Sequence, residues 1–240
     1  MKVLILAAGQ GERLETLTDD VPKALVKVLG RELIRCQLDF LEDPSVTKIG
    51  VVGGYHAALV RNFLSKNNLP VDFFENTRFE QGSILTLKAA LDFLDDDFLM
   101  MNVDHIYPKR LLNKVVKQAK GITAVCDFDR PLVEDDMKVK LDDHRHLFQI
   151  HKKLPQYDGG YIGMTYCPAD KIALYKQAME TTLVKLGEKT SVEMILGELA
   201  TRGEPVHIAD TSGIRWLEVD TIEDLQKAEK ALKSHPQFLA

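Results

Sequence analysis

The sequence has few of the features that mark several common protein classes. It contains three cysteines, Cys36, Cys126 and Cys167, and no C-x-x-C pair, so neither a disulfide framework nor a cysteine-ligated zinc site is expected. No apolar run approaches the ~20 residues that cross a bilayer. The apolar segment at the N-terminus stops after Ala8, which is too short for the core of a signal peptide. We therefore expect a cytoplasmic protein whose cysteines are small buried hydrophobic residues.

An excess of positive charge is also missing. The formal net charge is −5, whereas a nucleic-acid surface normally needs a basic stripe, so no nucleic-acid partner is expected. The chain has 240 residues, of which 45% are hydrophobic, enough for one large core. No repeat, linker or low-complexity tract divides it. We expect one domain over residues 1–240.

Two common phosphate-binding motifs are missing, although a Gly-rich turn follows the first apolar run. The pattern G-x-x-x-x-G-K-[ST] occurs nowhere, which excludes a P-loop. Residues 9–14 read GQGERL, and a dinucleotide-binding turn needs Gly or Ala where Leu14 stands, because its helix packs closely on the strand. A dinucleotide-binding Rossmann fold is therefore excluded as well.

Apolar runs alternate with amphipathic segments along the chain, which predicts a mostly parallel sheet with right-handed crossovers. Residues 137–141 and 147–150 flank a turn and predict an antiparallel hairpin outside that sheet, with Lys138 and Lys140 on its solvent face. The predicted fold is α/β and Rossmann-like, with a mostly parallel central sheet flanked by helices and an added antiparallel hairpin. The expected strands are 2–7, 47–53, 71–75, 98–103, 122–128, 159–166, 205–209 and 216–219, and the expected helices are 30–43, 56–66, 83–94, 108–120, 168–179, 191–201 and 221–233, with Ser83 and Thr221 as N-caps.

The stretch from Leu6 to Lys27 combines the requirements of a polyphosphate site. Gly9 and Gly11 let backbone N–H groups come close to an anion, and Arg13 and Lys23 add two cations on what we expect to be a surface loop. Arg suits bidentate contact with phosphate and Lys acts as a mobile point charge. The simpler alternative is that the glycines only form a tight turn.

Two aspartates lie where strands are expected to end. Asp104 follows the strand 98–103, and Asp220 precedes the last helix. Ligands of open α/β sheets bind at the carboxyl ends of the strands, where the Gly-rich turn also lies. Each aspartate has a structural alternative, because Asp104 could simply end a strand and Asp220 could cap the helix.

The pattern L-A-A-G-x-G-x-R-L followed by P-K-A-L closely resembles the signature of nucleotidyltransferases that make nucleotide-activated sugars and alcohols. The segments around Asp104, Asp220, 134–140 and 152–158 extend the resemblance to cytidylyltransferases that act on inositol 1-phosphate, phosphocholine and phosphonates. Many of those relatives have an Asn-rich turn where this chain has Glu80-Gln81-Gly82-Ser83. The resemblance implies the nucleotide-diphospho-sugar transferase type of fold.

The resemblance also implies a role for individual residues. Mg²⁺ would be held by Asp104 and Asp220, two carboxylates of the kind that this hard ion prefers. Lys138, alone among the hairpin lysines, would touch phosphate, although a hairpin normally turns its lysines to water. His105 and Glu193 each have a non-functional alternative. His105 could be a wall residue of the site, and Glu193 could lie on a solvated helix face. The implied catalytic residues are Arg13, Lys23 and Lys138, the nucleotide-binding residues are Leu6, Ala7, Ala8, Gly9, Gly11, Gln81 and Ser83, and the acceptor-binding residues are His105, Asp158 and Glu193.

The predicted function is that of a Mg²⁺-dependent cytidylyltransferase, which joins CTP to a small phosphomonoester or phosphonate and releases pyrophosphate. A sugar-1-phosphate nucleotidyltransferase that uses UTP, GTP or dTTP is the alternative within this class. Two alternatives lie outside the nucleotidyltransferases. One is a glycosyltransferase of similar topology, which is disfavoured because Val103-Asp104-His105 is not a D-x-D triplet. The other is a non-catalytic nucleotide-binding regulator. The sequence leaves a homodimer open.

Overall fold

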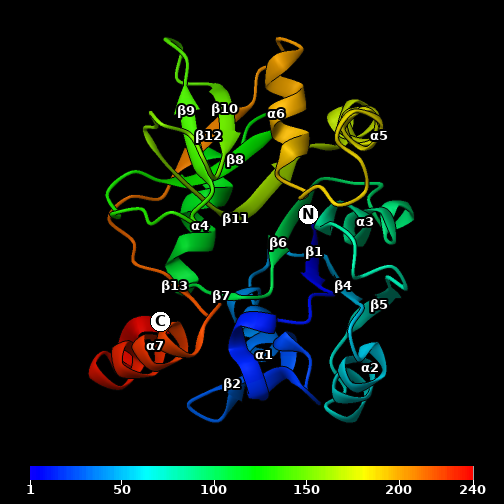
Figure 1. Cartoon of the computed structure of the whole chain (residues 1–240), viewed down its shortest axis with the longest axis vertical. Helices are drawn as coiled ribbons and strands as arrows, with labels where there is room; N and C mark the ends of the chain where they lie inside the picture. Colours follow the sequence, from blue (N-terminus) through cyan, green and yellow to red (C-terminus); the bar gives the residue numbers. More distant parts are fainter. Residues whose placement is uncertain (240) are drawn as a thin grey trace.

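A nine-stranded sheet forms the centre of the molecule in a computed structural model that describes residues 1–239 (Figure 1). Seven strands follow the order β10-β9-β11-β6-β1-β4-β5, while β8 pairs with β11 and β12. The strands of this sheet are β1 (Lys2–Ala7), β4 (Lys48–Gly53), β5 (Val71–Glu75), β6 (Phe98–Asn102), β8 (Thr123–Asp127), β9 (Lys138–Leu141), β10 (Leu147–His151), β11 (Gly159–Cys167) and β12 (His207–Asp210).

The sheet is parallel from β6 to β5, and beyond β6 every pair is antiparallel except β8 with β12, which is parallel. Strand β1 runs parallel to both β4 and β6, and β5 runs parallel to β4. Strand β11 is antiparallel to β6, β8 and β9, so the hairpin β9–β10 continues the same sheet. The predicted hairpin is confirmed, but its expected position outside the sheet is wrong, because β11 joins the two parts. The predicted fold class is confirmed.

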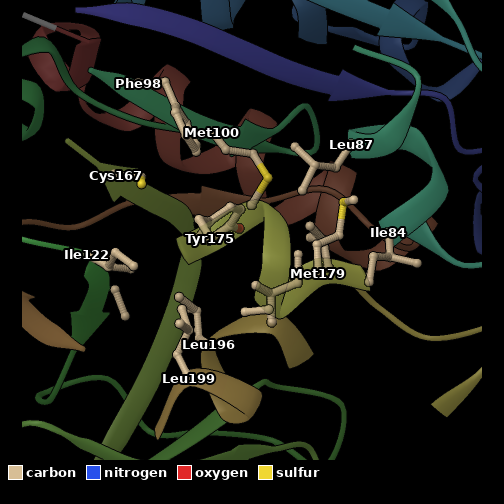
Figure 2. Close-up of a cluster of buried hydrophobic side chains, with 14 of the residues drawn as sticks. Ile84, Leu87, Phe98, Met100, Ile122, Cys167, Tyr175, Met179, Leu196 and Leu199 are labelled. Carbon is tan, nitrogen blue, oxygen red and sulfur yellow. The ribbon is translucent and has the colours of Figure 1, made fainter. Parts of the chain in front are cut away.

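Helices cover both faces of the sheet, which explains why β1 is apolar at every position after Lys2. Val3, Ile5 and Ala7 pack in the cluster that includes residues of α1 (Leu33–Phe40), α2 (Ala57–Lys66) and α4 (Lys109–Gln118). Leu4 and Leu6 point to the opposite face, toward α3 (Ser83–Lys88), α5 (Ile172–Leu186) and α6 (Met194–Thr201). Figure 2 shows this second cluster, in which Tyr175 of α5 lies close to Phe98 of β6. A strand buried on two faces needs the continuous apolar run that the sequence shows.

Local turns change two of the predicted helices. The helix expected from residue 30 begins at Leu33, because Leu29 and Gly30 adopt positive φ and join the short strands β2 (Lys27–Val28) and β3 (Arg31–Glu32). The helix expected over 83–94 ends at Lys88 and is followed by a 3₁₀ turn. Ser83 is not its N-cap: Gly82 holds that position, and the Ser83 hydroxyl accepts a hydrogen bond from the Val192 N–H at 2.9 Å.

A second, two-stranded sheet lies beside the C-terminal helix. Strand β13 (Leu217–Glu218) does not join the central sheet but pairs antiparallel with β7 (His105–Ile106). Helix α7 (Ile222–Ser234) follows, and Thr221 caps it as predicted, with a capping box to Asp224. Within residues 1–239, none of the helices has the length and apolarity needed to span a bilayer.

Candidate active site

A cavity of about 880 Å³, here called the strand-edge cavity, opens at the carboxyl ends of the parallel strands. It contains twelve of the fifteen residues that the sequence analysis selected, and Ala7, Lys138 and Asp158 are not part of its lining. Sequence positions far apart therefore meet at one place, as the sheet-edge argument predicts. The selected residues that line it are Leu6, Ala8, Gly9, Gly11, Arg13, Lys23, Gln81, Ser83, Asp104, His105, Glu193 and Asp220.

The Gly-rich turn leaves β1 and forms one wall of the cavity. A side chain at Gly9 would meet no protein atom within 4 Å, so the backbone there faces open space. Gly11 has φ of 81°, and a Cβ on it would lie 3.0 Å from the Cβ of Lys23. Positive φ and this close approach both favour glycine, so Gly11 does more than shorten a loop. It lets Lys23 pack directly under the turn.

The pairing of β7 with β13 brings the two predicted metal aspartates together. Asp104 precedes β7 and Asp220 follows β13, and the Val219 N–H donates to the Asp104 carbonyl at 2.9 Å. The Lys23 ammonium contacts a carboxylate oxygen of each, at 2.9 Å from Asp104 and in a shorter contact with Asp220. Arg13 also reaches Asp220, at 2.5 Å. The predicted cations and carboxylates therefore form one charge cluster.

Lys23 is buried in this cluster, which corrects the expectation that it lies on a surface loop. Its exposed fraction is 7%, whereas the Arg13 side chain is 53% exposed. Burial lowers the pKa of the Lys23 ammonium, but Asp104 and Asp220 raise it above its ordinary value. Burial likewise raises the pKa of the Asp104 carboxyl, and Lys23 and His105 outweigh that effect and hold it well below its usual range. Lys23 and Asp104 therefore each stabilise the charged form of the other.

His105 forms a side wall of the cavity and orients Asp104. Its Nδ1 lies 2.7 Å from a carboxylate oxygen of Asp104, and its ring stacks on Trp216 at a centroid distance of 5.1 Å. Burial lowers the pKa of His105, but Asp104 raises it above its ordinary value. Glu218, across the β7–β13 pair, has a raised pKa because it is buried. The imidazole is thus already engaged on one side, as expected of a wall residue.

Sequence reasoning missed three residues at the cavity mouth. Asp135 accepts hydrogen bonds from Arg13 and, at 2.6 Å, from Lys152, so it joins the Gly-rich turn to the segment after β10. Asp136 lines the cavity beside it. Asp135, Asp136 and Lys152 lie within the two segments, 134–140 and 152–158, on which the family resemblance partly rested. Each has a charged neighbour in the sequence, so the sequence does not indicate which charged side chain enters the cavity. Only the fold shows which side chain points inward.

Lys138 and Asp158 lie away from the cavity lining. The Lys138 ammonium is buried and donates to four backbone carbonyls, so the expectation that it points to solvent is wrong. Asp158 pairs with Lys140 at 2.8 Å and accepts from the Leu141 N–H. Both predicted ligand contacts lack geometric support here, because these polar groups already have partners.

The cavity lining also contains the carboxylate of Glu193. Glu193 is 8% exposed, and among residues 1–239 its carboxylate has neither a hydrogen-bond donor nor an ion-pair partner. Ser83 and Gln81 line the cavity near it, on the loop that enters α3. Gly82 allows this close packing, since a Cβ there would lie 1.9 Å from the Thr190 carbonyl oxygen. The carboxylate oxygens of Glu193 are open to the cavity and have no protein donor among the described residues, so they can accept hydrogen bonds from a ligand.

The residues around Lys23 fit a Mg²⁺ site of the kind that relies on the substrate. Among the described residues, no three or more His, Cys, Asp or Glu side chains are grouped so as to hold a metal by themselves. Two carboxylates within reach of one ammonium nonetheless supply the donors that Mg²⁺ takes from a protein, the remaining positions being water and phosphate oxygens. Asp104 and Asp220 are therefore the residues that would hold it.

The cavity combines a glycine-rich turn with cations and carboxylates at the carboxyl edge of a parallel sheet. This is the arrangement of a nucleotide-binding α/β protein. Residues 3–237 match the model of the MobA-like NTP transferase domain. The chain therefore belongs to the MobA-like NTP transferase family, and the predicted nucleotidyltransferase family is confirmed.

Relatives and solved structures agree with this assignment. The chain is 32% identical to the bifunctional IPC transferase and DIPP synthase of Aquifex aeolicus over 234 residues, which cover 95% of this chain and 51% of that protein. It is 25% identical to the CTP:phosphoglutamine cytidylyltransferase of Campylobacter jejuni, with 94% and 98% covered. The chain thus spans about half the length of the first relative and nearly all of the second.

Two solved structures share the fold. The inositol-1-phosphate CTP transferase from T. maritima superposes with a TM-score of 0.83 at 20% identity and covers 100% of this chain and 97% of its own. The CTP:phosphocholine cytidylyltransferase from Streptococcus pneumoniae gives a TM-score of 0.74 at 21% identity, with 96% and 98% covered. At these identities the likeness establishes the fold.

Proposed function

We propose that this chain is a Mg²⁺-dependent cytidylyltransferase that transfers CMP from CTP to a small phosphomonoester or phosphonate and releases pyrophosphate. The observation that carries the proposal is the charge cluster of Arg13 and Lys23 with Asp104 and Asp220 at one edge of the sheet. One relative and two proteins of the same fold have names that specify CTP together with phosphoglutamine, inositol 1-phosphate or phosphocholine. These names support cytidine as the base and a small phosphomonoester as the acceptor.

The proposed reaction requires alignment and charge neutralisation more than proton transfer. A phosphomonoester has a second pKa of about 6, so its oxygen is already nucleophilic at neutral pH. That oxygen attacks the α-phosphorus of CTP, the bond to the β-phosphate oxygen breaks, and pyrophosphate leaves with the electron pair. When bound, Mg²⁺ supplies charge neutralisation on phosphate oxygens. Arg13 and Lys23 stabilise the charge that develops on the triphosphate.

The rest of the cavity serves recognition in this proposal. The backbone of Ala8 and Gly9, with Gln81 and Ser83, contacts the nucleotide, since these residues line the cavity, whereas Ala7 does not. Glu193 contacts donor groups of the acceptor, because its carboxylate faces the cavity and has no protein partner within the described residues. His105 holds Asp104 in place. Asp158 is not assigned an acceptor contact, since Lys140 neutralises it outside the cavity.

A screen of pyrophosphate release tests the proposal. Each of CTP, UTP, GTP, ATP and dTTP is combined with Mg²⁺ and a panel containing inositol, choline, amino-acid and sugar phosphates and aminoalkyl phosphonates. We expect turnover with CTP and one of the non-sugar acceptors, and a larger thermal shift with CTP than with the other nucleotides. Turnover only with UTP, GTP or dTTP and a sugar 1-phosphate would assign the rival activity, and no turnover with any pair would contradict an enzymatic role.

A further inference from the structure

The turn that carries Asp104 is held from both sides by hydrogen bonds to its backbone. Asp104 lies between β6 and β7, and its own carbonyl accepts from the Val219 N–H at 2.9 Å. The carbonyls before and after it accept instead from the side-chain amide of Gln37. The Gln37 Nε2 lies 3.3 Å from the Val103 carbonyl oxygen, and its contact with the His105 carbonyl is shorter. One side chain thus supplies the donors on both flanks of Asp104.

Gln37 reaches this turn from α1, which packs against β7 (Figure 1). The side chain has an exposed fraction of 0%, and its amide has two N–H groups for the two carbonyls. Its Oε1 is buried and accepts no hydrogen bond from any of the residues 1–239. A buried acceptor without a donor is destabilising, so an apolar side chain would suit this position better if packing were its only role.

The same helix also packs against the 3₁₀ turn Lys23–Leu25. Ala24 of that turn lies in one hydrophobic cluster with Ile34 and Leu38, which flank Gln37 on α1. A single element therefore contacts both the segment that carries the Lys23 ammonium and the turn that carries the Asp104 carboxylate. The relative placement of the two charges depends on α1.

A neutral donor suits this turn better than a cation. The Asp104 carboxylate already lies 2.9 Å from the Lys23 ammonium and 2.7 Å from the Nδ1 of His105. Lys or Arg in place of Gln37 could also donate to the carbonyls. Either would add a positive charge at the turn, however, and so oppose the binding of a further cation. An amide holds the backbone and leaves the charge of the cluster unchanged.

We propose that Gln37 is a positioning residue, whose amide fixes the turn so that the Asp104 carboxylate faces Lys23 and the site of the divalent cation. The role of Asp104 as a ligand of that cation rests on the proposed function. Residues that orient a metal ligand without touching the metal contribute about 10- to 100-fold to metal affinity. Gln37 would act in this way through the backbone of the ligand.

Binding of Mn²⁺ to the protein, followed by the electron paramagnetic resonance of the free ion, tests this role without a substrate. Mn²⁺ takes the same oxygen ligands as Mg²⁺. We expect Gln37→Met, which keeps the length of the side chain but removes its donors, to weaken Mn²⁺ binding by about 10- to 100-fold. Gln37→Asn, with an amide one methylene shorter, should weaken it in the same direction and replaces Gln37→Met if that variant does not fold.

Gln118 provides the matched control. It lies at the end of α4 and also joins a helix to the backbone of a strand, since its amide donates to the Asp210 carbonyl at 2.9 Å and accepts from the Asp210 N–H at 3.0 Å. It does not line the strand-edge cavity. Gln118→Met should therefore lose stability but bind Mn²⁺ as the wild type does.

The fluorescence of Trp216 reports on the turn in the protein without metal. Trp216 is the only tryptophan of the chain, and it stacks on the His105 ring at a centroid distance of 5.1 Å. Freeing the His105 carbonyl in Gln37→Met should shift the Trp216 emission from that of the wild type, whereas Gln118→Met should leave it unchanged.

The two measurements separate this inference from the proposed function. Wild-type Mn²⁺ affinity in a folded Gln37→Met or Gln37→Asn variant, or an equal loss in Gln118→Met, would overturn the positioning role. If the wild type itself binds no Mn²⁺, the metal site of the proposed function fails. The emission then decides alone: a shift confined to the Gln37 variants supports their role in holding the turn, and an unshifted spectrum overturns it.

Discussion

At the scale of single residues, Lys23 and Arg13 contact the same carboxylate, that of Asp220, from different environments. Lys23 is buried between Asp104 and Asp220, whereas Arg13 lies at the surface. Removing a buried member of such a cluster leaves carboxylates without their counter-charge, which costs stability as well as activity. The same substitution at an exposed position costs activity alone.

We therefore predict that Lys23→Ala and Arg13→Ala both lose most turnover, but that only Lys23→Ala lowers the free energy of unfolding appreciably. The expected loss is about 1–3 kcal/mol for Lys23→Ala and at most about 1 kcal/mol for Arg13→Ala. Urea unfolding of both variants and steady-state kinetics check this. Equal stability of the two variants would mean that Lys23 contributes little to the charge cluster.

Asp104→Asn and Asp220→Asn test the proposed metal site. Each should lower kcat by about 10²–10³-fold, as loss of one electrostatic contact to developing charge commonly does, and the effects should not add in the double variant because both side chains would hold one ion. Thr221 and not Asp220 caps α7, so loss of a helix cap would not explain an inactive Asp220→Asn variant. The measurement is kcat against Mg²⁺ concentration for the wild type, both single variants and the double variant. An active Asp220→Asn enzyme with an unchanged Mg²⁺ requirement would exclude the two-carboxylate site.

At the scale of elements, an ion-pair network ties α5 to α6. Glu198 of α6 accepts hydrogen bonds from Lys185 of α5 at 2.8 Å and from Arg202 at 2.7 Å. The hydrogen bonds from Lys185 and Arg202 lower the pKa of Glu198 below its ordinary value of 4.5 and outweigh the effect of burial, which raises it. The network therefore stabilises the fold above that value and loses its contribution as pH falls through the lowered pKa.

Glu198→Gln should consequently be less stable than the wild type at pH 7, by about 1 kcal/mol, and equally stable once acid has protonated Glu198 in both folded and unfolded states. Urea unfolding across that pH range gives the comparison. Glu223→Gln is a matched control, because its pair with Lys227 on α7 is exposed on both sides. A deficit that persists unchanged in acid would exclude the charge as its cause.

The sequence predicted the elements built from local patterns better than it predicted the contacts between distant segments. The buried strand β1, the Gly-rich turn after it and the Thr221 cap follow from apolar pattern and local chemistry, which need only neighbouring residues. The sequence did not predict that β7 and β13 form a separate two-stranded sheet, because their pairing joins segments that are far apart in the chain. Lys138 was misplaced for the same reason: strand alternation assigns it to water, but carbonyls of two other turns enclose it.

At the scale of the whole molecule, the three cysteines report on the integrity of the core. All are free and buried, as predicted; Cys126 and Cys167 belong to one hydrophobic cluster and Cys36 to another. Burial raises the pKa of Cys36 to about 11 and of Cys167 to about 12, and it raises that of Cys126 as well. A thiol that is both protonated and shielded reacts slowly.

The native protein should therefore react with no equivalent of a coloured thiol reagent at pH 8 over the time in which denatured protein reacts with three. Counting thiols against denaturant concentration should give the same midpoint as the loss of helical signal, provided that unfolding is two-state. A thiol that reacts in the native protein would reveal local opening, and replacing each cysteine by serine in turn would identify it.

The pairing of β7 with β13 also has a consequence for the order in which the protein is made. Translation proceeds from the N-terminus, so Lys23 and Asp104 emerge from the ribosome well before the segment that carries Asp220. The contact between Val219 and Asp104 closes a long loop of chain, an entropically costly and late event. A nascent chain can thus pair β1, β4, β5 and β6 early, but the charge cluster of Lys23, Asp104 and Asp220 is incomplete until the segment that carries Asp220 has been synthesised.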